Sequence, residues 1–164
     1  MLDSGRMPYR ILFVCLGNIC RSPSGENIMN AVLQEAGLAQ AVICDSAGTI
    51  DVHRGKGPDP RMCQAAAEHG YTFRGAARQV TTQDLETQDL ILAMDRDNLT
   101  ELRALAGAGE HHAKMELFAN YCTGDQFPDE VPDPYYGGEE GFHEVITMVE
   151  NGCQGLLKHV KKIL

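Results

Sequence analysis

A cysteine and an arginine six positions apart are the residues of this chain best suited to chemistry. Cys15 ends an apolar run that begins at Ile11, and Arg21 lies in the polar, glycine-containing stretch that follows. A thiol between the end of a strand and the start of a helix faces the positive end of the helix dipole, and arginine adds a planar cation. Such surroundings lower the pKa of a free thiol from about 8.5 to about 3.5–7.5. We therefore expect Cys15 to be a thiolate nucleophile.

The residues between this cysteine and arginine predict a loop that binds an anion through its backbone. Gly17 and Asn18 tolerate positive φ, which lets successive N–H groups point inward. Ser22 is a candidate N-cap and Pro23 suits the first helical position, so the helix dipole would point into the loop. The Cys–Arg spacing alone is weak evidence for such a loop. Its coincidence with these other features makes the prediction specific. Together they favour attack on a phosphoryl group and a covalent thiophosphate intermediate.

The pattern of apolar residues predicts the elements that position this loop. Short apolar runs predict strands over 11–15, 41–47, 90–94 and 114–118. Helical spacing predicts helices over 22–36, 60–69 and 139–164, and a further helix that carries Leu99, Leu102 and Leu105 and stops at Gly107. Residues 123–138 are acidic and too irregular for an element. Strands that alternate with helices predict an α/β fold with a parallel sheet, in which ligands bind beyond the carboxyl ends of the strands.

Composition excludes several classes of function. The 164 residues include 14 basic and 23 acidic side chains, a net charge of −9 that argues against nucleic acids and anionic membranes as partners. No apolar run approaches the ~20 residues of a membrane span. The six cysteines are scattered without metal-ligand spacing, and His111-His112 stand alone, so we expect reduced thiols, a cytoplasmic location and no metal. We expect residues 1–9 to be a flexible leader and 10–164 to form a single domain.

The segment VCLGNICRSP, together with DPYYGG from residue 133, resembles the low-molecular-weight protein tyrosine phosphatases. DSAGT (45–49), GPDPR (57–61), ARQV (77–80) and LAMDRDN (92–98) are similar to the same family. The resemblance implies a four-stranded parallel sheet with helices on both faces. It also implies hydrolysis of phosphotyrosine in proteins through a cysteinyl-phosphate, with no cofactor and with inorganic phosphate or other oxyanions as inhibitors.

The resemblance also assigns the general acid. A leaving phenoxide needs a proton and the phosphoenzyme then needs a base, and one carboxyl group can serve both steps. Six carboxylates lie within 125–140, and composition does not choose among them. The family resemblance places this role at Asp133, between two prolines, and makes the following Tyr135 and Tyr136 a wall of the aryl pocket.

Further residues take roles from the same resemblance. The phosphate-binding residues are Leu16, Gly17, Asn18, Ile19, Cys20 and Ser22. Asn18, Ser22 and Ser46 match positions that hold the shape of the loop, and Ser22 also assists the leaving thiolate. Asp95 matches an aspartate near the phosphate-binding loop. An ordinary role in a turn or a helix cap is the alternative for both Ser46 and Asp95. Cys20 matches a residue that captures oxidised Cys15 as a disulfide, the alternative being a packing role.

Two departures from the family pattern bear on the site. Val52 and His53 stand where the family often has an aromatic residue, which weakens one wall of the aryl pocket. Gly75-Ala76 stand where a histidine is frequent, which predicts a looser brace on Asn18.

Three other functions stay open from the sequence. An arsenate reductase would use the same loop. Its thioredoxin-coupled form needs two further cysteines that 64–121 lacks, and a glutathione-linked form that uses Cys15 and Cys20 stays open. A phosphate-binding module without turnover would not need Cys15, Arg21 and Asp133. Protein-arginine phosphatases carry threonine at the position of Ile19, and a branched apolar side chain there favours an aryl ring over a guanidinium.

Overall fold

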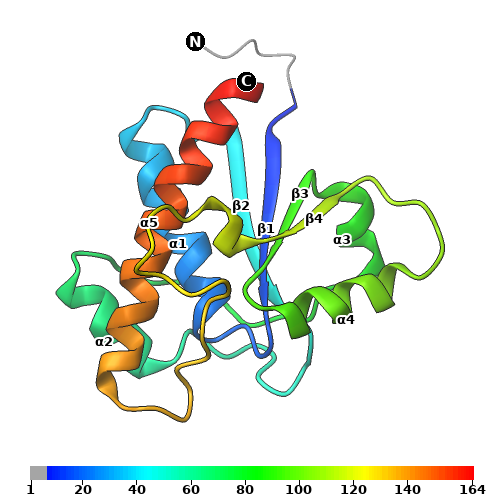
Figure 1. The fold of residues 1–164 in the computed structure, drawn as a ribbon. Coiled ribbons are helices and arrows are strands. Elements are labelled where there is room, and N and C mark those ends of the chain that lie inside the picture. The colour runs from blue at the N-terminus through cyan, green and yellow to red at the C-terminus, as the bar shows by residue number, and fades with distance from the viewer. Residues whose placement is uncertain (1–6) are drawn as a thin grey trace.

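The computed structural model describes residues 7–164, and its core is a four-stranded parallel sheet in the order β2-β1-β3-β4 (Figure 1). The elements in chain order are β1 (Tyr9–Cys15), α1 (Arg21–Glu35), β2 (Val42–Gly48), α2 (Pro60–Glu68), α3 (Thr82–Thr87), β3 (Leu90–Ala93), α4 (Arg96–Ala106), β4 (Lys114–Leu117), the 3-10 helix η1 (Phe118–Tyr121) and α5 (Glu139–Ile163). The predicted α/β class with helices on both faces is confirmed.

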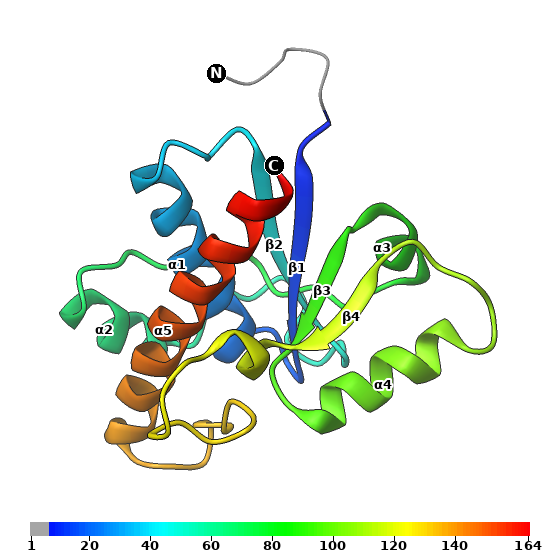
Figure 2. The same ribbon diagram turned by 45° about the horizontal axis from the view of Figure 1, so that its top comes forward.

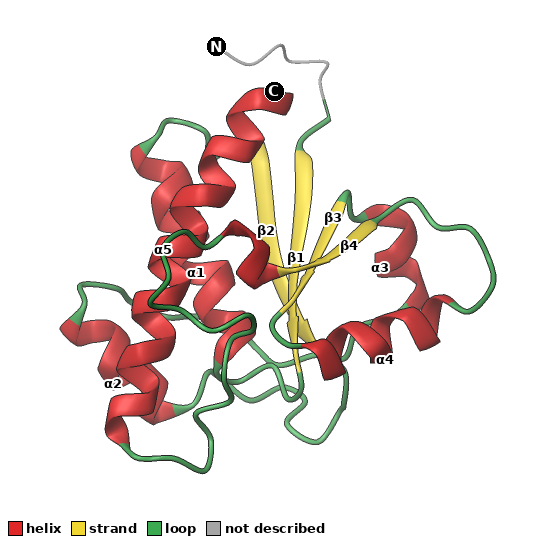
Figure 3. Ribbon diagram, viewed as in Figure 1, coloured by secondary structure: helices red, strands yellow, loops and turns green. Residues whose placement is uncertain are grey.

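Helices cover both faces of the sheet. Helices α1, α2 and α5 lie over one face, and α3 and α4 over the other, an arrangement that Figures 2 and 3 show from two directions. The central strand β1 is therefore shielded on both sides, and residues 11–14 are fully buried. A run of consecutive apolar residues is what such a strand requires.

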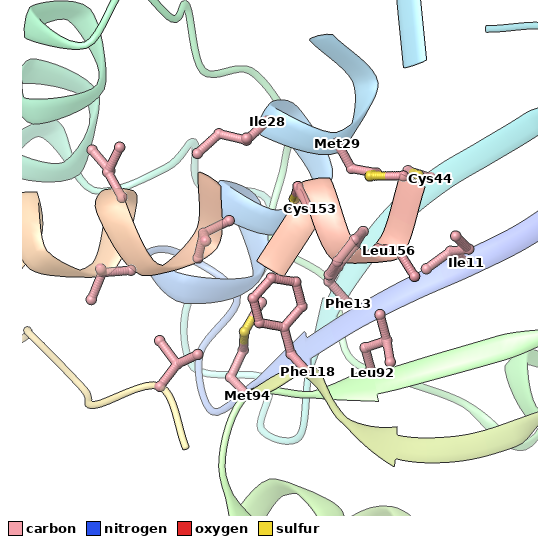
Figure 4. Packing of buried hydrophobic residues seen from close by; sticks show 14 of the residues in the cluster. Ile11, Phe13, Ile28, Met29, Cys44, Leu92, Met94, Phe118, Cys153 and Leu156 are labelled. Carbon is pink, nitrogen blue, oxygen red and sulfur yellow. The ribbon is translucent and has the colours of Figure 1, made fainter. Parts of the chain in front are cut away.

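The larger core lies between the sheet and α1 and α5. Phe13 of β1 and Phe118 of η1 pack as tilted rings with centroids 6.0 Å apart, beneath Cys153 and Leu156 of α5 (Figure 4). Burying such aromatic rings contributes some of the largest apolar areas available to a side chain. This packing fixes α5 over β1 and thereby closes the sheet on that side.

The structure differs from the sequence prediction at several element ends. Strand β1 begins at Tyr9, whose N–H donates to Ala41 O, so the strand extends into the predicted leader; residues 1–6 lie outside the described residues. Helix α3 was not expected, because its six residues contain one buried apolar side chain, Leu85, and show no helical period. It is held instead by a capping box between Thr81 and Asp84. No helix of the described residues is long and apolar enough to cross a membrane.

Candidate active site

A pocket of about 290 Å³ opens at the edge of the sheet where the parallel strands end. It is lined by Cys15, Leu16, Gly17, Ile19, Cys20, Arg21, Ile50, Val52, His53, Asp133, Tyr135 and Tyr136. Most residues expected at the site from the sequence therefore share one cavity. Asn18, Ser22, Ser46 and Asp95 lie outside this lining. Ser22 contacts Cys15 and Asp95 contacts Arg21, while Asn18 contacts Ser22 and Ser46.

Cys15 is the last residue of β1 and points toward the start of α1. It is buried, and its Sγ lies 3.0 Å from Ser22 Oγ. The predicted N-cap role of Ser22 is wrong: the helix begins at Arg21 and Cys20 occupies the cap position. The serine hydroxyl is engaged elsewhere, because it accepts a hydrogen bond from Asn18 Nδ2 at 2.8 Å and keeps its own proton to donate to the Cys15 sulfur or to Ala47 O.

The loop between Cys15 and Arg21 presents free backbone donors. Three of its carbonyl groups are occupied: those of Cys15, Leu16 and Ile19 accept from the N–H groups of Thr49, Ile50 and Asp59. In the part of the chain that the structure describes, no acceptor receives a hydrogen bond from the N–H groups of residues 16–20. Successive unpaired N–H groups at a helix N-terminus form an anion site. Gly48 makes this loop possible, because a Cβ there would lie 2.7 Å from Leu16 O.

Asn18 holds the loop in shape. It is the one described non-glycine residue with positive φ, at 58°, and its side chain is 4% exposed. Its amide donates to Ser22 Oγ and, at 2.9 Å, to Ser46 Oγ, while its Oδ1 accepts from the Arg78 N–H at 3.0 Å. The Arg78 backbone therefore supplies a donor to Asn18, and the looser brace expected from Gly75-Ala76 stays a prediction.

Glu26 and Arg78 also support the loop, through Ser46 and Asn18, and neither was predicted from the sequence. Ser46 Oγ donates to Glu26 Oε1 at 2.5 Å, so the hydroxyl proton is directed away from Asn18. Burial raises the pKa of Glu26, and its hydrogen bond from Ser46 opposes this effect. The Arg78 guanidinium is held by both carboxylate oxygens of Asp84 and by Asp45. These contacts join residues 52 positions apart in sequence, Glu26 and Arg78, through the loop they both support.

Arg21 lies between two carboxylates at the floor of the pocket. Its Nη1 pairs with Asp95 Oδ2 and donates to Val131 O at 3.2 Å, and its Nη2 lies 3.5 Å from Asp133 Oδ2. Burial acts to lower the pKa of Arg21, but the charges of Cys15, Asp133 and Asp95 raise it above its ordinary value. The guanidinium is therefore a fixed cation next to the thiol.

Asp95 performs both of the roles considered for it. It is the N-cap of α4, where its Oδ1 accepts from the Asn98 N–H at 2.7 Å. Its other oxygen binds Arg21. One side chain at the end of β3 thus caps a helix and orients the arginine.

Asp133 and the two tyrosines form the outer part of the pocket. The Asp133 side chain is 38% exposed, and its Oδ1 accepts from the Tyr135 N–H at 3.0 Å. The Tyr135 and Tyr136 rings meet edge to face at 4.9 Å, and Arg61 stacks over the Tyr135 ring and donates to Tyr135 O. The aromatic wall expected from the sequence is therefore present on this side.

The opposite wall comes from the loop after β2. Ile50, Val52 and His53 line the pocket, and the His53 ring faces the Tyr135 ring at 6.3 Å. From the sequence, Val52 and His53 were expected only as departures from the family pattern, and Ile50 was not expected at the site. Their position after the second predicted strand was the available signal, because ligands bind where such loops follow parallel strands.

Cys20 faces the same pocket as Cys15 but differs in chemistry. Burial raises the pKa of the Cys20 thiol, and the charges of Asp59 and Cys15 raise it further. Cys20 is therefore a protonated thiol beside the candidate nucleophile, and both are free cysteines.

The arrangement combines the parts of a phosphoryl-transfer site. It holds a sulfur nucleophile, unpaired N–H donors and a fixed guanidinium for phosphate oxygens, a carboxyl group at the pocket mouth, and aromatic rings that fit a flat substituent.

Comparisons with known proteins identify the family and relatives of this chain. Residues 10–163 match the family model described as low molecular weight phosphotyrosine protein phosphatase. A putative low molecular weight protein-tyrosine-phosphatase of Synechocystis is 49% identical over 94% of this chain and 98% of its own length. A Streptomyces coelicolor protein named low molecular weight protein-tyrosine-phosphatase is 45% identical over 95% and 96%. The crystal structure of an Entamoeba histolytica protein tyrosine phosphatase superposes with a TM-score of 0.89 at 42% identity, covering 94% of this chain and 97% of that one.

Proposed function

The chain belongs to the low molecular weight phosphotyrosine protein phosphatase family, and we propose that it hydrolyses phosphotyrosine in proteins through a phosphorylated Cys15. The observation that carries this proposal is the pocket itself. It places Cys15 beside the free N–H groups of its loop and Arg21, with Asp133 and two tyrosine rings at the mouth. The phosphate group of an aryl phosphate fits the donors around Cys15, and its aromatic ring fits the tyrosine side chains at the mouth.

In the first step the Cys15 thiolate attacks phosphorus in line with the bond to the tyrosyl oxygen. A sulfur–phosphorus bond forms, the phosphorus–oxygen bond breaks, and the phenoxide takes the proton of Asp133. The N–H groups of the loop and Arg21 bind the equatorial oxygens, where charge spreads in the transition state.

In the second step a water molecule attacks the phosphocysteine. Asp133, now ionised, accepts the proton of this water, and the sulfur leaves as a thiolate. The Ser22 hydroxyl at 3.0 Å supports this step, because it can donate its proton to the leaving sulfur. Inorganic phosphate is released from the same donors and is thus expected to inhibit competitively.

The test is turnover on p-nitrophenyl phosphate and on a panel of phosphopeptides, with rapid quenching and mass spectrometry to find the phosphorylated cysteine. A phosphate on Cys15 during turnover supports the proposal. Binding of phosphate without turnover would instead indicate a binding module. Arsenate reduction with glutathione, at a rate above that of phosphopeptide hydrolysis, would favour the reductase alternative.

We further propose that Cys20 protects Cys15 from irreversible oxidation. Both thiols border one pocket, so a sulfenic acid on Cys15 can condense with the Cys20 thiol, releasing water and forming a disulfide. A cytoplasmic location, which we propose from the free cysteines, would provide thiol reductants for recovery.

Peroxide followed by dithiothreitol tests this role. Wild-type protein should recover most of its activity and show a Cys15–Cys20 link by mass spectrometry, whereas Cys20→Ser should keep a larger irreversible loss. Cys63→Ser, which changes a thiol outside the pocket, is the matched control. Full recovery of Cys20→Ser, with no link in the wild type, would leave Cys20 a packing role.

A further inference from the structure

A cluster of three side chains of the types that ligate metals lies between α2 and α5, outside the catalytic pocket. Glu68 ends α2, and Glu139 and His143 lie on the first turns of α5. One ligand atom from each of the three lies within 4.8 Å of the others. None of them lines the pocket that holds Cys15. We propose that these three side chains bind a divalent cation of the zinc type and thereby join α2 to α5.

The positions of the three residues suit one ion. Glu139 and His143 are four residues apart on one helix and therefore lie on the same face, one turn from each other. Glu68 reaches them from α2, which runs beside α5 in Figures 1 and 2. His143 Nε2 lies 2.9 Å from Glu68 Oε2. Two ligands about 2.1 Å from a tetrahedral ion are about 3.4 Å apart, so a small outward movement admits the ion between them.

The far side of His143 already has the support that metal-bound imidazoles have. Its Nδ1 lies 3.1 Å from His69 Nε2, and His69 Nδ1 lies 3.3 Å from Glu150 Oε1. Glu150 in turn accepts a hydrogen bond from the Tyr71 hydroxyl at 2.7 Å. A histidine that binds a metal through one nitrogen donates the N–H of its other nitrogen to such a partner, which fixes the ring and its tautomer.

The protons of this chain can be counted with the ion in place. His143 Nε2 binds the metal, so its proton lies on Nδ1 and is donated to His69 Nε2. His69 then carries its proton on Nδ1 and donates it to Glu150. Both imidazoles are neutral and every ring nitrogen has one partner. The ion takes the place of a proton on His143 Nε2, the nitrogen that lies 2.9 Å from Glu68 Oε2.

An ordinary ion pair accounts for only part of the cluster. His143 and Glu68 pair without a metal, but within residues 7–164 Glu139 has neither a hydrogen bond nor an ion pair through its side chain. Two carboxylates around one imidazole leave an excess of negative charge that a divalent cation neutralises. Imidazole and carboxylate ligands suit zinc, and the exposed position of both glutamates leaves room for a water ligand.

Zinc titration of the full-length Cys15→Ser protein tests the proposal, because this substitution removes the competing thiolate of the catalytic pocket. Calorimetry should show one saturable site. X-ray absorption at the zinc edge should show nitrogen and oxygen ligands at about 2.0–2.1 Å and no sulfur at about 2.3 Å. Sulfur ligation would place the ion at another cysteine and overturn the proposal.

Matched variants locate the site. In the same background, His143→Gln and Glu139→Gln should each lose zinc affinity by more than about 100-fold, and His69→Gln should lose about 10–100-fold. Controls on α5 are His159→Gln and Glu140→Gln, which should bind zinc as before. At a zinc concentration about a hundred times the Kd, the Tm should rise by about 5–10 °C only where the site is intact.

Measurements of zinc affinity and of phosphopeptide hydrolysis distinguish a failure of the metal site from a failure of the proposed function. In the presence of a chelator, His143→Gln and Glu139→Gln in the otherwise wild-type chain should hydrolyse phosphopeptides at the normal rate. Unchanged zinc affinity in both variants would overturn the metal site whatever the catalytic activity proves to be.

Discussion

The loop that binds phosphate and the loop that carries Asp133 form one pocket, yet they are built in opposite ways. Asn18, Arg21 and Ser22 are almost fully buried. The Asn18 side chain donates hydrogen bonds to Ser22 and Ser46, and Arg21 pairs with Asp95. Asp133 is 38% exposed, and the Tyr136 ring is 93% exposed. The second loop is attached to the first chiefly through Arg21, which contacts Val131 O and Asp133.

This difference separates two tasks. A donor set that stabilises developing charge must be fixed before the substrate arrives, because reorganisation during the reaction costs free energy. The part that receives the leaving group meets a protein chain of varying sequence and needs an open surface. We therefore expect changes to the buried residues of the first loop to affect all substrates alike. Changes in the second loop, or at Ile19 where the first loop lines the pocket, should depend on the substrate.

The most severe test of this comparison removes the nucleophile. Cys15→Ser should lower turnover by at least about 10⁴-fold on every phosphate ester and keep oxyanion binding, since the N–H groups remain. Arg21→Ala should weaken both turnover and binding. Phosphate binding by calorimetry and steady-state kinetics measure the two effects, with Cys122→Ser as the control. Wild-type turnover in Cys15→Ser would exclude the proposed mechanism.

Asp133→Asn tests the open loop. Turnover of phosphotyrosine peptides should fall by ~10²–10⁴-fold, the usual contribution of a general acid. The loss should be much smaller for aryl phosphates whose leaving groups need no proton. Steady-state kinetics on a series of aryl phosphates measures how the loss of turnover depends on the leaving group. Asp129→Asn is a control in the same acidic segment. An equal loss across the series would remove Asp133 from the acid role.

Ile19 is the position where the buried loop could itself select a substrate. Its half-buried side chain lines the pocket, where it can pack on a ring and leaves guanidinium N–H groups without partners. Ile19→Thr should shift the ratio of kcat/KM for phosphotyrosine over phosphoarginine peptides toward phosphoarginine by about 10–100-fold. The wild type should prefer phosphotyrosine. The opposite preference would show that the wall formed by Val52 and His53 dominates selection.

The smallest effect concerns Glu26 and the pH dependence of stability. Burial raises the pKa of Glu26, so the folded protein holds its proton at pH values where the unfolded chain, with an ordinary pKa near 4.5, has lost it. The stability contributed by this proton is complete below pH 4.5 and is lost as the pH rises through the folded pKa. Glu26→Gln should flatten this part of the profile. Urea unfolding between pH 4 and 8 measures the change against Glu140→Gln, and parallel curves for wild type and Glu26→Gln would contradict it.

The sequence was sufficient for features that depend on neighbours along the chain. The apolar runs of β1 and β3, the spacing in α5 and the loop after Cys15 are such features, and the structure contains all of them. Periodicity reports burial, and burial determines where a strand or an amphipathic helix lies.

The sequence was insufficient where a role depends on contacts between distant segments. Ser22 looked like a cap because its position fits one, but Asn18 and Cys15 occupy its hydroxyl. The support from Arg78 and Glu26 becomes visible only when both segments reach the same loop. The cluster of Glu68 and His143 joins residues 75 positions apart, so no ligand spacing could reveal it.

The position of β1 at the centre of the sheet has a consequence for the newly made protein. Cys15 and Arg21 leave the ribosome early, but β1 needs β2 on one side and β3 on the other, and α5 must pack on α1 to close the core. Contacts between segments far apart in the sequence carry a larger loop-closure cost and slow folding. The phosphate site therefore forms only after segments well beyond Cys15 have been synthesised and packed, and until then Cys15 lacks the surroundings expected to make it a nucleophile.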